Sequence, residues 1–93
     1  MSSGRESPAL HVATIAHGGR IWDTYLDFEE EDPRPVTLRA RLRFDPTDGN
    51  TAETVSTALI IIEDSYEEAV AKARAMDDRQ LQALLRSCLP DPE

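Results

Sequence analysis

The hydrophobic pattern of the chain changes its period once, near residue 64, and no other feature constrains the fold as strongly. Before that point apolar and polar residues alternate singly, as they do in strands with one buried face. After it, apolar residues recur at every third or fourth position, as in amphipathic helices. Strands followed by helices predict an α+β domain, with a four-stranded antiparallel β-meander and one or two C-terminal α-helices packed on one face.

Two glycines predict the first hairpin. Gly18 and Gly19 separate the β-prone residues 10–16 from the alternating residues 21–28. A two-residue turn of type I′ requires positive φ at both central positions, which glycine adopts without steric cost. Opposed residues of a hairpin share a face of the sheet. The turn predicts these pairs: His17 with Arg20, Ile15 with Trp22, Ala13 with Thr24, and His11 with Leu26.

The third and fourth strands are predicted at residues 36–44 and 53–62. A loop with four acidic residues and two prolines, residues 29–35, precedes the third strand, because proline cannot donate to a strand ladder. Even-numbered residues of the third strand are apolar and are predicted to face the helices. If the next turn pairs residues of equal parity, the even-numbered residues of the fourth strand share that face. The odd-numbered ones, Val55, Leu59 and Ile61, are then predicted on the opposite face.

The last third of the chain carries the helix signals. Ser65 followed by Glu68 has the spacing of an N-cap and the third helical residue of a capping box. Asp77 followed by Gln80 repeats that spacing. One unbroken helix over residues 66–89 would keep the same apolar stripe, so the sequence leaves open whether there is one helix or two.

The chain has 93 residues, the length of one domain. We expect a flexible N-terminal tail over residues 1–9, a single α+β domain over residues 10–90, and a C-terminal tail over residues 91–93. The longest apolar run, residues 58–62, is too short to span a membrane. A single cysteine, Cys88, excludes an internal disulfide and fits a reducing compartment, so we expect a cytoplasmic protein.

The charge balance narrows the function classes. Ten basic residues stand against eighteen acidic ones, and the formal net charge at pH 7 is −8. A general nucleic-acid binder needs a cationic footprint, so this balance argues against that class. An acidic surface keeps a small protein soluble by self-repulsion. The alternative use of such a surface is to block a basic site, as an acidic inhibitor or an antitoxin-like protein would.

Two short helices cover one face of a four-stranded sheet, and we call the other face the open face. Apolar residues there predict contact with a protein partner or with a second copy of the chain, unless the fourth strand packs them at the sheet edge. An acid–arginine ladder is expected on this face, formed by Asp23, Tyr25, Asp27, Thr37, Arg39 and Arg41. Besides Leu10 and Val12, the predicted interface comprises Ile21, Tyr25, Arg39, Arg41, Val55, Leu59 and Ile61.

The sequence shows no convergent catalytic or metal-ligating set. His11 and His17 lie roughly 20 Å apart along one strand, too far to share a metal ion. Cys88 lies on an apolar helical stripe, which is typical of a core residue. The acidic turn at residues 45–53 lacks the spacing of a calcium-binding loop. We therefore expect no metal and no cofactor, and the one candidate for a ligand pocket is the pair Trp22 and His11.

These observations favour a small non-catalytic accessory or interaction module, homodimeric or partner-binding through the open face. Two alternatives stay open: the acidic inhibitor, and a small-ligand enzyme with a pocket near Trp22 and His11. Salt dependence separates the interaction module from the acidic inhibitor. An apolar interface persists at high salt, whereas an acidic decoy loses its partner as charges are screened.

Overall fold

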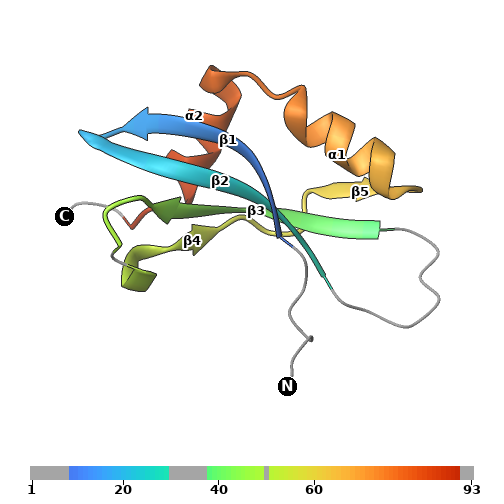
Figure 1. Ribbon diagram of the computed structural model, residues 1–93, viewed down its shortest axis with the longest axis horizontal. Coiled ribbons are helices and arrows are strands. Elements are labelled where there is room, and N and C mark those ends of the chain that lie inside the picture. The colour runs from blue at the N-terminus through green and yellow to red at the C-terminus, as the bar shows by residue number, and fades with distance from the viewer. Residues whose placement is uncertain (1–8, 30–37, 50, 91–93) are drawn as a thin grey trace.

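The computed structural model describes residues 9–29, 38–49 and 51–90. In this part of the chain a five-stranded, twisted sheet carries both helices on one side (Figure 1). The strands run in the order β1-β2-β3-β4, and β5 also pairs with β3. The predicted α+β class is therefore confirmed. The elements are β1 (Ala9–His17), β2 (Arg20–Phe28), β3 (Leu38–Pro46), the 3-10 helix η1 (Thr51–Glu53), β4 (Val55–Ser56), β5 (Ile61–Glu63), α1 (Tyr66–Arg74) and α2 (Asp78–Cys88).

Four of the predicted features lie wholly or partly outside the described residues. These are residues 1–8 of the N-terminal tail, residues 91–93 of the C-terminal tail, and the segment 30–37, which holds most of the acidic loop and Thr37 of the predicted ladder. Among the described helices, none is long and apolar enough to cross a membrane.

The first hairpin forms as its glycines predict. Gly18 has φ 62° and Gly19 has φ 78°, so both occupy the left-handed region that a type I′ turn needs. This turn joins β1 to β2. Three predicted pairs are confirmed: His17 with Arg20, Ile15 with Trp22, and Ala13 with Thr24.

The fourth predicted pair of this hairpin was wrong. His11 pairs with Tyr25 rather than with Leu26, because a β-bulge shifts the register between His11 and Ala13. The bulge has a physical reason. Regular alternation would leave Leu10 and Val12 in water, whereas with the extra residue both pack against the core. Full burial of such a side chain contributes about 1.5–3 kcal/mol, and the partial burial of Leu10 and Val12 contributes a part of that, which favours the irregular strand.

The pairing of β2 with β3 confirms that the acidic and arginine rows share a face and gives the register that the sequence did not specify. Asp27 pairs with Arg41 and Tyr25 with Arg43. The backbone N–H of Glu29 donates to the carbonyl of Arg39 at 2.8 Å, which extends this register by one step. Arg43, which the predicted ladder did not include, thus lies opposite Tyr25.

The predicted fourth strand is broken into β4 and β5, and its parity was wrong. Val55 pairs with Phe44, and Ile61 pairs with Ala40, so odd-numbered residues face the helices. An even number of residues, 45–54, separates Phe44 from Val55, and this length reverses the parity. Val55 and Ile61 therefore leave the predicted interface: Val55 packs against the core and Ile61 is fully buried.

The segment from β4 to β5 has more residues than the segment of β3 that pairs with its two ends. Val55 to Ile61 spans six residue steps, whereas Phe44 to Ala40 spans four. Thr57 bridges the break. Its backbone N–H donates to the carbonyl of Leu42 at 2.9 Å, and its Oγ1 accepts from the Leu42 N–H at 3.1 Å. A side chain thus replaces the missing ladder acceptor, as buried backbone groups require.

Two capped helices follow, which settles the question of one helix or two. Ser65 Oγ accepts from the N–H of Glu68 at 3.1 Å and caps α1. Asp77 and Gln80 form a full capping box at the start of α2. The helices cover a core of these buried residues: Ile15, Trp22, Leu26, Ala40, Leu42, Phe44, Ile61, Ala69, Ala73, Leu81 and Leu85.

Candidate functional site

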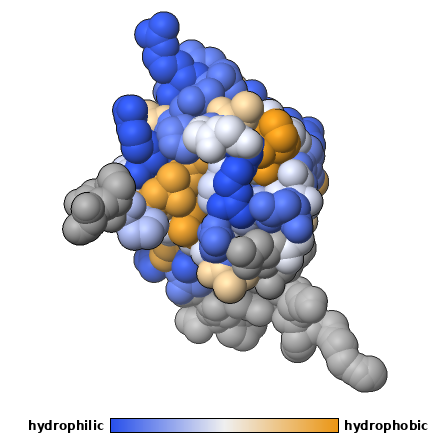
Figure 2. Space-filling view, turned by 90° about the vertical axis from the view of Figure 1, so that its left-hand side faces the viewer, coloured by the Kyte–Doolittle hydropathy of each residue, from blue (hydrophilic) through white to orange (hydrophobic). Residues whose placement is uncertain are grey.

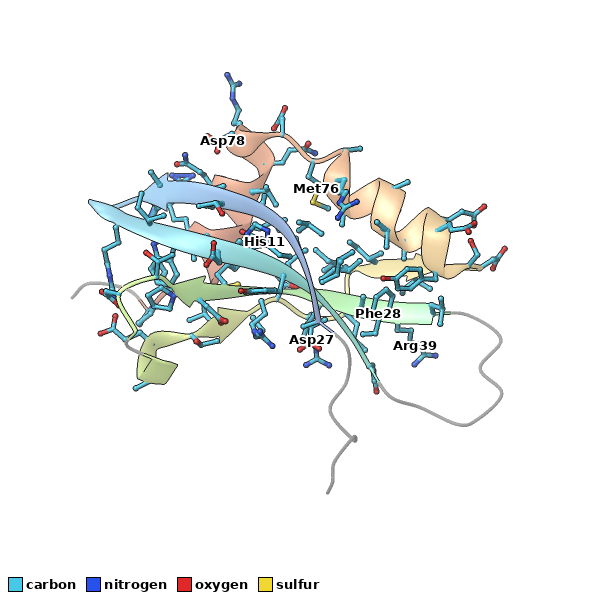
Figure 3. All side chains as sticks on the ribbon, in the orientation of Figure 1. His11, Asp27, Phe28, Arg39, Met76 and Asp78 are labelled. Atoms are coloured by element: carbon cyan, nitrogen blue, oxygen red, sulfur yellow. The ribbon has the colours of Figure 1, made fainter. Side chains whose placement is uncertain are left out.

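The open face carries most of the chemistry-bearing side chains of the sheet. Strand alternation places one set of residues toward the helices and the other set here. In Figure 3, Asp27 and Arg39 project below the sheet, whereas Met76 lies above it with the helices. The described residues of the open face are Ala9, His11, Thr14, Ala16, Ile21, Asp23, Tyr25, Asp27, Arg39, Arg41, Arg43, Asp45, Ser56 and Ile62.

The bulge of β1 creates a polar cluster near the first turn. His11 Nε2 lies 3.0 Å from Thr14 Oγ1 and 3.2 Å from Asp23 Oδ1. The Thr14 hydroxyl also donates to Asp23 Oδ1 at 2.8 Å. A nucleophile–histidine–acid relay needs its two partners on different ring nitrogens. Here both partners meet the same nitrogen, so the cluster orients His11 and does not assemble such a relay.

Tyr25 lies at the centre of the open face between an imidazole and a guanidinium. Its ring meets the His11 ring edge-on, with centroids 5.4 Å apart and an interplanar angle of 73°. The Arg43 Cζ lies 4.8 Å from the centroid of the Tyr25 ring. A partly exposed cation–π contact contributes on the order of 0.5–1 kcal/mol. Three strands thus hold one aromatic ring in a defined position.

Arg43 connects this ring to two carboxylates. Its Nε and Nη2 donate to the two oxygens of Asp45 at 3.2 and 3.3 Å, and its Nη1 lies 3.9 Å from Asp27. Asp45 also accepts from the hydroxyl of Thr54 at 3.0 Å. The centre of the open face is therefore a network in which Arg43, Asp45 and Thr54 are joined by hydrogen bonds, with Asp27 at a longer distance.

Arg41 differs from its neighbour Arg43. It opposes Asp27 in the β2–β3 register, yet no ion pair joins Arg41 to any residue in the described part of the chain. Its side chain is partly exposed. Arg41 therefore keeps its hydrogen-bonding capacity for a group outside these residues.

Arg20 binds two acidic side chains of the turn at residues 45–53, which was considered above as a calcium-binding loop. It donates to Glu53 and, at 2.8 Å, to Asp48, while its guanidinium lies 5.2 Å from the Trp22 ring centroid. These hydrogen bonds, to Glu53 first and to Asp48 second, raise the pKa of Arg20 above its ordinary value. The acids thus bind an arginine. Within the described residues, no three His, Cys, Asp or Glu side chains converge on a metal position.

Trp22 and His11, the residues predicted to line a ligand pocket, lie on opposite faces of the sheet. Trp22 is 2% exposed in the core, where its Nε1 donates to the carbonyl of His17 at 3.3 Å. His11 lies on the open face because of the bulge. The structure therefore gives them no shared pocket. Cys88, predicted as a core residue, is partly buried.

Of the predicted interface residues, four share the open face. Ile21 is 46% exposed, Tyr25 and Arg41 are partly exposed, and Arg39 is exposed. Leu59 is partly buried in the connection from β4 to β5. The interpretation missed His11, which reaches Tyr25 through the bulge. The signal for it is the pair of apolar residues that flank His11 and compete for burial.

A second exposed apolar region lies on the helix side. Ile60, Met76, Ala83 and Leu84, with the polar Gln80, line a shallow groove of about 410 Å³. Ile60 is 38% exposed. Figure 2 shows the end of the molecule with the first turn, where hydrophobic residues form patches between hydrophilic ones. Apolar exposure is thus distributed over several small regions.

Comparison of the chain with protein-family models, with curated proteins and with solved structures gives no match.

Proposed function

We propose that this protein is a non-catalytic protein-binding module and that its open face is the binding surface. The observation that carries the proposal is the position of Tyr25, half-buried between His11 and Arg43 on a sheet face that no described helix covers. Tyrosine and arginine are enriched where interfaces gain most of their binding energy. Because neighbouring side chains already orient the Tyr25 ring, little side-chain entropy would be lost when a partner packs against it.

The helix surfaces are less suited to this role. They expose Tyr66 and three arginines, Arg74, Arg79 and Arg86, but their other exposed residues are mostly of the types depleted at interfaces, including Glu67, Glu68, Ala71, Lys72, Asp78, Ala83 and Ser87. Hydrophilic residues cover most of the upper part of Figure 2, which is the helix side. The sheet is favoured because its tyrosine and arginine are oriented by neighbouring side chains and lie together on one face.

The charges of the open face indicate the kind of partner. A row of arginines on β3 lies beside aspartates on β2. A purely basic partner would meet the arginine row as well as the aspartates. The mixture therefore favours a partner that presents both signs of charge over the basic target of an acidic inhibitor.

Photo-crosslinking in cells that express the full chain tests the proposal. A benzoyl-phenylalanine at position 25 probes the open face, and the same analogue at position 66 is the matched control, since Tyr66 is 50% exposed on the helix side. We expect cross-linked protein from position 25 and little from position 66. Equal cross-linking from both positions, or none from position 25, would overturn the proposal.

A further inference from the structure

We infer that the partner of the open face is a second copy of this chain, packed face to face about a twofold axis that runs parallel to the strands. This inference rests on the proposed function, because it names the occupant of the same surface. It comes from the register of β2 and β3, in which Asp27 opposes Arg41 and Tyr25 opposes Arg43.

The register makes the open face complementary to itself. A twofold axis above the line between β2 and β3 places β2 of one copy over β3 of the other and keeps each residue at its own level along the strands. Asp27 then faces Arg41 of the second copy, and Tyr25 faces Arg43 of the second copy. Both contacts occur twice, as a closed dimer requires.

The charges also select this axis over the other in-plane axis. An axis perpendicular to the strands would place β2 over β2 and β3 over β3. It would also reverse the order of levels along the strands. Centred on the levels of Tyr25 and Asp27, it would bring Arg41 of one copy over Arg43 of the other twice and leave Asp27 opposite Tyr25, and such like-charge contacts disfavour a complex strongly. Charge complementarity thus leaves the arrangement with the axis parallel to the strands.

Asp27 and Arg41 are the pair best placed to act between copies. Arg41 makes no ion pair with a described residue, and the Asp27 carboxylate reaches Arg43 at 3.9 Å, which is long for a salt bridge. Each side chain therefore has capacity for a partner. Exposed Ile21 and Ile62, which are 46% and 51% exposed, add apolar area toward the two ends of the face.

At the level of Asp23 and Asp45 the same axis would bring acids together. Two features reduce the repulsion there. Asp23 is hydrogen-bonded by Thr14, and Asp45 by Arg43 and Thr54. The sheet is also twisted, so two packed faces diverge away from the centre of contact. The contact is therefore centred on the levels of Tyr25 and Asp27.

A charge-reversal experiment tests the arrangement. Sedimentation of the wild-type chain should show a dimer at high micromolar concentration. D27R and R41D should each weaken that dimer by more than about tenfold, because each places like charges across the axis. A one-to-one mixture of the two variants should form a heterodimer, in which both contacts are again between opposite charges. E67R and R79D on the helix surface are the matched controls and should leave the dimer intact.

The outcomes separate this inference from the proposed function. A wild-type chain that stays monomeric overturns the second copy as partner, and so do variants that dimerise like the wild type or a mixture that stays monomeric. If position 25 then cross-links to a different protein, the proposed function stands. If D27R or R41D loses its circular dichroism, the neutral variants D27N and R41Q replace them, and each should weaken the dimer to a smaller extent.

Discussion

The two faces of β2 and β3 carry alternate residues of the same strands, yet they differ in what holds them together. On the covered face Leu26, Leu42 and Phe44 are 0% exposed and pack under the helices. On the open face Tyr25 and Arg43 are partly exposed and are held by hydrogen bonds and ring contacts. Burial of apolar area dominates folding energy, whereas exposed polar pairs contribute little. The comparison assigns stability to the covered face, and the binding role that we propose belongs to the open face.

The largest expected effect is on the covered face. Leu42→Ala should lower the free energy of unfolding by about 2–5 kcal/mol, because it leaves a cavity in a fully buried site. Arg41→Ala, one residue away on the open face, should change it by no more than about 0.5 kcal/mol. Urea denaturation followed by circular dichroism measures both. Similar losses for the two variants would contradict the division between the faces.

The first turn decides which residues of β1 and β2 reach each face. Gly19→Val places a β-branched residue at φ 78°, so we expect a loss of about 1–3 kcal/mol. No atom lies within 4 Å of an added Cβ, so the cost comes from the backbone alone. Gly19→Asn is the control and should lose less, because asparagine tolerates this region. Equal losses for Val and Asn would refute the backbone explanation.

Cap removal tests how firmly α1 covers the sheet. Ser65→Ala removes the acceptor of the Glu68 N–H and should cost about 1 kcal/mol in thermal or urea unfolding. Ser56→Ala, at an exposed strand position, serves as the control and should have a smaller effect. An unchanged midpoint for Ser65→Ala would show that α1 does not depend on its cap.

A threonine-to-valine substitution should change the free energy of unfolding in opposite directions on the two faces. Thr24 is the buried polar residue of the covered face, and its Oγ1 has no hydrogen-bond partner among the described residues. Thr24→Val should therefore stabilise the protein by about 1 kcal/mol. Thr14→Val on the open face removes a hydrogen bond to Asp23 and should cost about 0.5 kcal/mol. Unfolding curves that shift in the same direction would break the comparison.

Much of the open face could be read from the chain. The alternation in residues 21–28 and 38–44 places Tyr25, Arg39 and Arg41 on one face in every register that keeps the apolar residues together. Such registers differ by two residues, and a shift by two residues keeps each side chain on its face. The environment of Tyr25 could not be read in this way. It depends on Arg43, which requires the actual register, and on His11, which requires the bulge.

Local signals determined the turn at Gly18 and Gly19, the caps at Ser65 and Asp77, and the order of strands and helices, because each depends on a few neighbouring residues and their backbone preferences. Tertiary structure decided the bulge at His11 and the parity of the fourth strand. Both result from competition for burial: Leu10 and Val12 reach the core only if β1 is irregular, and Val55 and Ile61 reach it only if the connection after β3 reverses the parity. Such competition is settled between segments far apart in the chain, where no local pattern records its outcome.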